Sequence, residues 1–116
     1  MTKIYGIPNC DTVKKARQWL ADNGIEYEFV DFKKTPPDEV LIKSWLADVP
    51  LETLLNKRGI TWRKLDDGQK AAAEHPASAI RLMVEQPSLI KRPVLDAGGR
   101  CYAGFQTACY ESVFKK

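Results

Sequence analysis

Cys10 is the residue of this chain whose surroundings best suit covalent chemistry. It ends the stretch Tyr5-Gly6-Ile7-Pro8-Asn9-Cys10 and directly precedes a segment with helical spacing. The free N–H groups and the positive dipole end at a helix start favour a thiolate, the nucleophilic form of cysteine. Lys14 and Lys15, one turn further on, act in the same direction, whereas Asp11 opposes it. The sequence predicts that Cys10 is a reactive nucleophile; the alternative is a buried, inert cysteine.

The other cysteines indicate that Cys10 works without a neighbouring thiol. A Cys-x-x-Cys redox pair would need a cysteine at position 13, where Val13 stands. Disulfide exchange therefore requires an external thiol, or Cys101 or Cys109 from far along the chain. Both of these have apolar neighbours, so packing is the better explanation for them. With an odd number of cysteines and one histidine, His75, we expect neither a disulfide framework nor a metal site.

The elements around Cys10 predict a βαβ unit. Ile4–Ile7 is typical of a strand, helical spacing begins at Asp11, and Asn23-Gly24 supplies a stop. Tyr27–Phe32 alternates as a second strand. Two strands joined by one helix are expected to lie parallel, with a right-handed crossover.

The middle of the chain is expected to be helical. Thr35-Pro36-Pro37-Asp38-Glu39 combines a capping residue, prolines suited to a first turn and early acids. A short helix is predicted over Leu51–Lys57 and another over Ala71–Glu85, interrupted near Pro76 and stopped by Pro87. The apolar residues expected to mark these helices are Val40, Leu41, Trp45, Leu46, Ile80, Met83 and Val84.

The end of the chain predicts a hairpin and a last helix. Val94-Leu95 and Arg100–Ala103 flank a Gly98-Gly99 turn, and Thr107–Phe114 has the composition of a terminal helix. The order β-α-β, helices, β-β-α predicts an α/β fold with a thioredoxin-like mixed sheet. We expect one domain, residues 1–116, with a helical insertion at about 35–88 between its two halves.

Arg92 and Pro93 are the second candidate feature. A proline that leads into a strand donates no ladder hydrogen bond and tolerates a cis peptide bond better than other residues. In a thioredoxin-like sheet this segment faces the thiol loop, so we expect Pro93 to be cis. Arg92 would then clamp an oxyanion or a carboxylate and stabilise the thiolate. The alternative for Arg92 is an ordinary surface arginine.

Composition and charge limit the classes of binding partner that we expect for this protein. Eighteen basic and fifteen acidic residues give a net charge of +3, with the signs interleaved along the chain. We therefore expect no nucleic-acid partner, while the mild positive charge favours a small anionic substrate. No apolar stretch is long enough to cross a bilayer, and the N-terminal residues lack the pattern of a signal peptide, so the cytoplasm is the expected location.

Three segments in order along nearly the whole chain resemble the family of ArsC, Spx and YffB proteins. These are Tyr5–Cys10 before a helix, Thr35-Pro36-Pro37 before another, and Ile90–Leu95 near the end. The resemblance to the YffB branch adds Cys10-Asp11-Thr12, Asn56-Lys57-Arg58-Gly59, Arg63-Lys64-Leu65 and Gly104-Phe105. The family's fold is a thioredoxin-like sheet with a helical insertion, which agrees with the expected order of elements.

Resemblance to the YffB branch implies a glutathione-linked thiol-disulfide oxidoreductase with Cys10 as its single nucleophile. Glutathione would be the co-substrate, a small thiol or disulfide the substrate, and no metal would take part. Arg92 would be catalytic, and the backbone before the cis proline would pair with the tripeptide. The binding residues that this implies are Asn9, Thr12 (toward the sulfur), Lys14, Arg58, Arg92 and Pro93.

Two other functions in the family stay open as alternatives. ArsC proteins attack arsenate with a cysteine and hold the oxyanion with three arginines. Cys10 and Arg92 match that set, but the other two arginines fall on Asn56 and near Ala103, which implies an altered anion site. Spx proteins are regulators that bind RNA polymerase and carry a Cys-x-x-Cys switch, which Val13 removes here. The Spx-type alternative is therefore a non-catalytic RNA polymerase-binding protein.

Overall fold

The computed structural model describes residues 2–116, which form two compact units. The first combines the chain up to Thr35 with Arg92–Lys116, and the second is Pro36–Lys91. The helical insertion expected at about 35–88 falls in the second unit. That the whole chain behaves as one domain stays a prediction.

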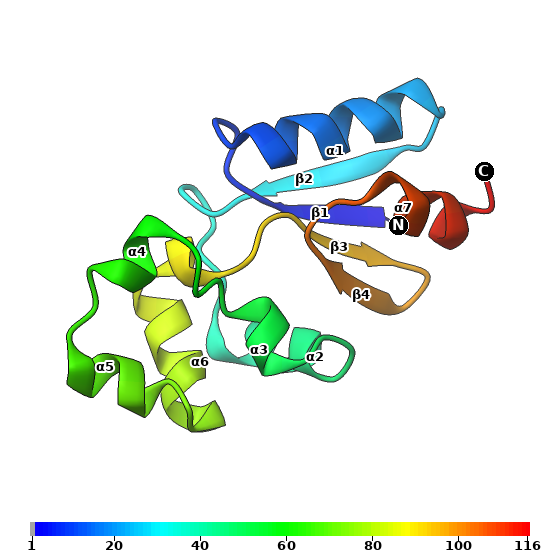
Figure 1. The fold of residues 1–116 in the computed structure, drawn as a ribbon. Coiled ribbons are helices and arrows are strands. Elements are labelled where there is room, and N and C mark those ends of the chain that lie inside the picture. Colours follow the sequence, from blue (N-terminus) through cyan, green and yellow to red (C-terminus); the bar gives the residue numbers. More distant parts are fainter. Residues whose placement is uncertain (1) are drawn as a thin grey trace. The chain divides into compact units, whose positions relative to one another are not determined.

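The first unit holds a four-stranded mixed sheet. Its elements are β1 (Thr2–Gly6), α1 (Asp11–Asp22), β2 (Tyr27–Asp31), β3 (Val94–Ala97), β4 (Arg100–Ala103) and α7 (Thr107–Phe114) (Figure 1). The strand order is β2-β1-β3-β4, with β1 parallel to β2 and antiparallel to β3. This βαβ–ββα arrangement is the thioredoxin-like fold that the order of elements predicted.

One apolar cluster fixes α1 and α7 on the same face of this sheet. Buried Ile4 and Leu95, which are register partners, pack with Leu20 of α1 and Tyr110 of α7. Trp19 meets the Tyr110 ring edge-on, with 5.6 Å between the ring centres. Both helices therefore share one buried cluster with the sheet.

Glycines close the elements of the first unit where the sequence predicted turns. Gly24 ends α1 with a φ of +67°, and Gly98 and Gly99 form the β3–β4 turn with φ of +61° and +79°. These are left-handed conformations that glycine adopts at no steric cost. The first strand is Thr2–Gly6 rather than the predicted Ile4–Ile7, because its pairing with β2 begins at Thr2.

The second unit is a set of short helices, as expected for the middle of the chain. They are α2 (Glu39–Leu46), α3 (Leu51–Leu54), α4 (Ile60–Arg63), α5 (Asp67–Ala72), α6 (Pro76–Glu85) and the 3-10 turn η1 (Pro87–Leu89) (Figure 1). Ile42 and Trp45 of α2 are buried, as are Ile80 and Met83 of α6. The apolar faces of these helices therefore supply the unit's core.

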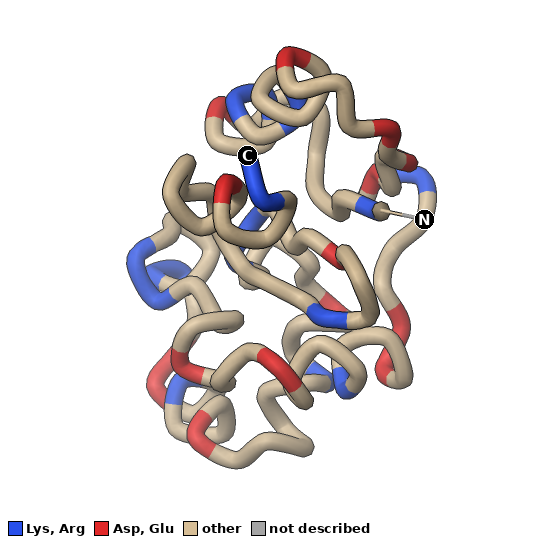
Figure 2. The backbone as a smooth tube through the Cα atoms, turned by 90° about the vertical axis from the view of Figure 1, so that its right-hand side faces the viewer, with Lys and Arg blue, Asp and Glu red and all other residues tan. Residues whose placement is uncertain are grey.

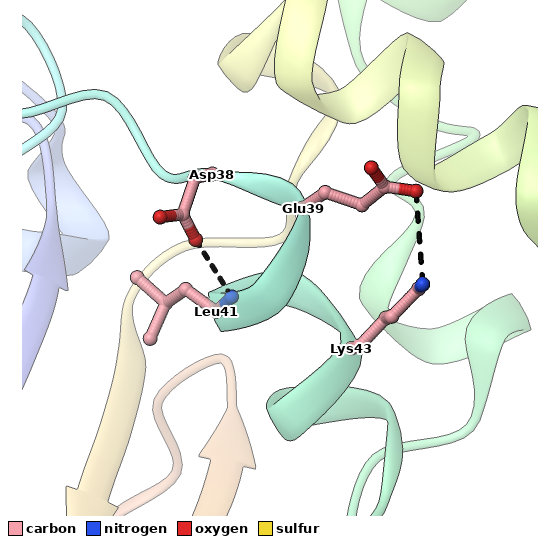
Figure 3. A network of polar contacts seen from close by, with 4 residues as sticks. All are labelled: Asp38, Glu39, Leu41 and Lys43. Atoms are coloured by element: carbon pink, nitrogen blue, oxygen red, sulfur yellow. Dashed lines mark hydrogen bonds and ion pairs between the residues drawn. The ribbon is translucent and has the colours of Figure 1, made fainter.

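The start of α2 corrects the sequence interpretation. The helix starts at Glu39 with Asp38 as its cap, whose carboxylate accepts the Leu41 N–H at 2.8 Å (Figure 3). Pro36 and Pro37 therefore precede the helix instead of forming its first turn. Val40 is 76% exposed, because it lies on the face opposite the buried side chains. It is not a core residue.

The helix predicted over Leu51–Lys57 is shorter than expected. It ends at Leu54, because Leu55 forms an isolated β-bridge with Ile90. The Asn56 N–H donates to the Leu89 carbonyl at 2.7 Å, and the Lys91 N–H donates to the Leu54 carbonyl at 2.7 Å. This non-local pairing replaces the helical hydrogen bonds that local propensity favours.

Charge is distributed without a long run of one sign. Figure 2 shows blue Lys and Arg segments interspersed with red Asp and Glu segments along the backbone tube. Within residues 2–116 no helix has the length and apolar character needed to cross a membrane.

Candidate functional site

Cys10 occupies the N-cap position of α1. Its φ and ψ are −93° and 126°, and its carbonyl accepts the first helical hydrogen bond, from the Lys14 N–H at 2.9 Å. No side-chain oxygen caps this helix. An N-cap side chain lies beside the free N–H groups of the first turn, so the half-buried thiol stands where a capping oxygen normally accepts hydrogen bonds. A thiolate there is next to the positive end of the helix dipole.

Close packing of β1 against α1 fixes the loop that carries Cys10. A Cβ on Gly6 would lie only 2.8 Å from a methyl carbon of Val13, so the strand end and the first helical turn touch. Val13 is fully buried. The position that a Cys-x-x-Cys motif would fill with a second thiol is therefore a packing position in this chain.

Strand register brings Arg92 and Pro93 to the edge of the sheet that carries Cys10. Tyr5 of β1 pairs with Val94 of β3, and continuing this antiparallel register by one residue sets Pro93 opposite Gly6. The Arg92–Pro93 peptide bond is cis, as predicted. The Pro93 carbonyl accepts the N–H of Gly104 at 2.8 Å, which ties the segment to the end of β4.

Other predicted site residues of the first unit lie within one helical turn of the thiol. Asn9 precedes Cys10 in the loop, while Thr12 and Lys14 belong to the first turn of α1, and all three are exposed. Arg92 is half-buried and Pro93 is buried. The fold therefore gathers a thiol, a hydroxyl, an amide and two cationic side chains at one edge of the sheet.

Arg58 belongs to the second unit, where it lines a cavity of about 290 Å³. The other lining residues are Glu52, Thr53, Leu55, Asn56, Lys57 and Lys91. The Arg58 N–H donates to the Asn56 side-chain oxygen at 3.2 Å, and the Lys57 ammonium lies 5.4 Å from the centre of the Trp62 ring. Three cations against one acid give this cavity a positive character.

Sequence reasoning missed one basic feature of α1. Arg17 stacks its guanidinium on Phe29 of β2, with Cζ 4.1 Å from the ring centre, and its Nε donates to the Tyr27 hydroxyl at 3.2 Å. The available signal was spacing, since Arg17 lies three residues after Lys14 and two aromatic residues alternate along β2. Which helix face meets which strand was not visible in one sequence.

The described residues hold no group of three or more metal-ligating side chains. Cys10, Cys101 and Cys109 are each half-buried and are not joined by disulfide bonds, with Cys101 in β4 and Cys109 in α7 as expected. Burial raises the pKa of Tyr5 in β1, and the nearby Asp96, Cys101 and Glu28 raise it further.

Fold and site together define a thioredoxin-like protein with one cysteine at the start of α1 and a cis proline on the neighbouring strand. Residues 5–113 match the model of the ArsC family. The chain belongs to the ArsC family, and this membership supports a thiol-based reductase.

Proteins that are similar to this chain include an arsenate reductase and a transcriptional regulator. A protein of Haemophilus influenzae is 38% identical over 98% of this chain and 99% of its own length. An arsenate reductase of Neisseria meningitidis is 27% identical over 88% of each chain. The global transcriptional regulator Spx of Streptococcus pyogenes is 25% identical over 90% of this chain and 78% of its own length.

Solved structures agree with the family and the fold. The structure of a YffB protein has a TM-score of 0.93 at 45% identity, covering 97% of this chain and 98% of that one. An arsenate reductase-related protein of Brucella melitensis has a TM-score of 0.76 at 49% identity, covering 99% of this chain and 95% of that one.

Proposed function

We propose that the protein is a glutathione-linked thiol-disulfide oxidoreductase of the cytoplasm, with Cys10 as its single nucleophile. The observation that carries this proposal is the position of Cys10, at the N-cap of α1 and at the sheet edge that also carries the cis Arg92–Pro93 bond. The first feature favours a thiolate, and the second sets a strand beside it along which a peptide-like ligand can lie.

The first half-reaction is attack by the Cys10 thiolate on one sulfur of a disulfide. A new sulfur–sulfur bond joins Cys10 to half of the substrate, the original disulfide bond breaks, and the other half leaves as a thiolate that takes a proton from water. The charge of Arg92 stabilises the Cys10 thiolate before attack and orients an anionic group of the substrate.

The second half-reaction needs a thiol from outside the chain. A glutathione thiolate attacks the half of the substrate bound to Cys10, restores the Cys10 thiolate and leaves as a disulfide with that half. Burial of Val13 at the position of a resolving cysteine supports this external step. The Arg92 backbone before Pro93 pairs with the tripeptide, while Asn9, Thr12 and Lys14 contribute polar contacts.

A turnover assay tests this proposal. Bis(hydroxyethyl) disulfide is reduced with glutathione, while NADPH consumption by glutathione reductase reports the product. Cys10→Ser is expected to lose all turnover above the uncatalysed rate, whereas Cys101→Ser and Cys109→Ser, the matched controls, retain it. Arg92→Gln is expected to lower kcat/KM by about 10- to 100-fold, the effect of losing one charge-assisted hydrogen bond. Unchanged turnover in Cys10→Ser would refute the proposal.

An arsenate reductase with an altered anion site is the second candidate. The similarity of this chain to an arsenate reductase of Neisseria meningitidis supports it. Arsenate-dependent oxidation of glutathione that is lost in both Cys10→Ser and Arg92→Gln would select this function.

A non-catalytic Spx-type regulator is the remaining alternative. The similarity of this chain to Spx extends over 90% of its length, although Val13 replaces the second cysteine of the Spx switch. Retention of RNA polymerase subunits by the purified protein, together with no turnover of either substrate, would select this function.

A further inference from the structure

A shallow groove beside α1 is lined by two basic side chains. Its volume is about 410 Å³, and its lining residues are Lys14, Arg17, Gln18, Ala21 and Tyr27. Within residues 2–116 neither Lys14 nor Arg17 forms an ion pair. The Asp22 carboxylate, at the end of the same helix, accepts a hydrogen bond from the Gln18 amide at 2.7 Å. The groove therefore presents two cations whose charge is available to a ligand.

Arg17 is held in one orientation by the aromatic residues of β2. Its guanidinium carbon lies 4.1 Å from the centre of the Phe29 ring and 5.9 Å from the centre of the Tyr27 ring. The hydrogen bond from Nε to the Tyr27 hydroxyl fixes the plane of the guanidinium group. Nε is thus engaged, while the two terminal nitrogens carry the other four N–H groups. A planar pair of nitrogens that is already ordered matches a carboxylate and loses little entropy on binding it.

The groove continues along the helix face that begins at Cys10. Cys10, Lys14, Arg17 and Ala21 have the spacing i, i+4, i+7 and i+11, so they share one face of α1 beside the buried face of Val13 and Ala16. At the rise of a helix, Lys14 and Arg17 lie about 6 Å and about 10 Å from Cys10 along the axis. Helical side chains also tilt toward the N-terminus, which brings both cations nearer to the thiol.

We propose that this groove binds a carboxylate of the disulfide that Cys10 attacks. The substrate class is a small disulfide with a carboxylate at about 6–10 Å from the attacked sulfur, the span from Cys10 to Lys14 and Arg17. Lys14 and Arg17 are positioning residues that raise the rate of mixed-disulfide formation more for such substrates than for disulfides without a carboxylate. This inference rests on the proposed function, since it assumes that the Cys10 thiolate opens the disulfide, forms a bond to one half and releases the other as a thiolate.

Three probes that differ in charge test the inference. Rate constants for mixed-disulfide formation at Cys10 are measured by quenched-flow mass spectrometry with oxidised glutathione, the neutral bis(hydroxyethyl) disulfide and the cationic cystamine. The variants are Arg17→Gln, Lys14→Gln and Lys15→Gln. Lys15 is the matched control, because it is the exposed neighbour of Lys14 on the same turn and does not line the groove.

Arg17→Gln and Lys14→Gln are each expected to slow the reaction with oxidised glutathione by about tenfold, the effect of one charge-assisted hydrogen bond at a partly exposed site. The rate of Arg17→Gln with the neutral disulfide should stay within about twofold of the wild type. Lys14→Gln and Lys15→Gln, which each remove one charge near Cys10, should change that rate by the same factor. With oxidised glutathione, Lys15→Gln should slow the reaction less than Lys14→Gln does. Lys14 is exposed, so its variant keeps the test decisive even where loss of Arg17 weakens packing on β2.

Failure of this inference and failure of the proposed function give different results. If Cys10 reacts with the neutral disulfide, but Lys14→Gln and Lys15→Gln slow oxidised glutathione equally, the groove is not a carboxylate site and only net charge matters. If Cys10 does not react with the neutral disulfide at all, the proposed function itself is wrong.

Discussion

The hydroxyl group of Tyr110 offers a direct test of the packing in the first unit. Tyr110 of α7 is fully buried and packs against Trp19 of α1. Its hydroxyl oxygen has no hydrogen-bond partner among the described residues. Burial, with a smaller contribution from Cys109, raises the pKa of this phenol well above its usual range. A buried polar group without a partner costs about 1–3 kcal/mol of stability.

Tyr110→Phe removes that oxygen and leaves the ring contacts with Trp19 and Phe105 in place. The variant is expected to gain about 1 kcal/mol in its free energy of unfolding, the lower end of the cost of an unsatisfied hydroxyl. For a chain of this length, that gain raises Tm by about 4 °C. Urea titration followed by tryptophan fluorescence gives the free energy, and calorimetry gives Tm.

A second tyrosine provides a control in which the expected change in the free energy of unfolding has the opposite sign. The Tyr27 hydroxyl accepts the Arg17 Nε–H at 3.2 Å, so Tyr27→Phe is expected to lose about 0.5–1.5 kcal/mol. If Tyr110→Phe is instead destabilised as much as Tyr27→Phe, its hydroxyl is hydrogen-bonded, for example to a buried water, and the reasoning about its cost is wrong.

The remaining predictions concern alkaline pH and two local contacts. Tyr110 ionises in the unfolded chain near pH 10 but keeps its proton in the folded protein. The wild type is therefore expected to lose stability above about pH 10, and Tyr110→Phe is expected to lose less. Urea titrations across that pH range measure the difference. Gly6→Ala places a methyl group against the stiff, buried Val13 and is expected to lower the free energy of unfolding by about 1–3 kcal/mol. Val13→Ala is expected to restore part of this loss in the double variant, and purely additive losses would contradict the close contact. Asp38→Ala is expected to cost about 1 kcal/mol through the lost cap on Leu41, whereas Glu39→Gln, which removes one exposed ion pair, should change thermal stability by less than about 0.5 kcal/mol; equal losses would contradict the role of the cap.

The βαβ and ββα halves were predictable because their signals are local. Asn23-Gly24 and Gly98-Gly99 meet backbone requirements that few other residues meet, so the end of α1 and the β3–β4 turn follow from residue types alone. The cis state of Pro93 followed from its place before a strand, together with the fold that the order of elements implied.

Features that depend on distant residues were not predictable in the same way. Leu55 leaves its helix to pair with Ile90, a contact across more than thirty positions that no local pattern encodes. The contact of Arg17 with Phe29 likewise depends on how α1 lies over β2. Tertiary pairing overrides helix propensity at Leu55, and it sets the side-chain contact of Arg17, which belongs to the groove beside α1.

In the proposed function, Cys10 is the one cysteine of the chain that forms the mixed disulfide, and external glutathione releases it. The most direct test of this claim is peptide mapping by mass spectrometry after the reduced protein reacts with oxidised glutathione, before and after addition of reduced glutathione. The account predicts one glutathione on Cys10, none on Cys101 or Cys109, and complete release by reduced glutathione. Modification of Cys101 or Cys109 in place of Cys10, or a Cys10 adduct that reduced glutathione does not remove, would contradict it.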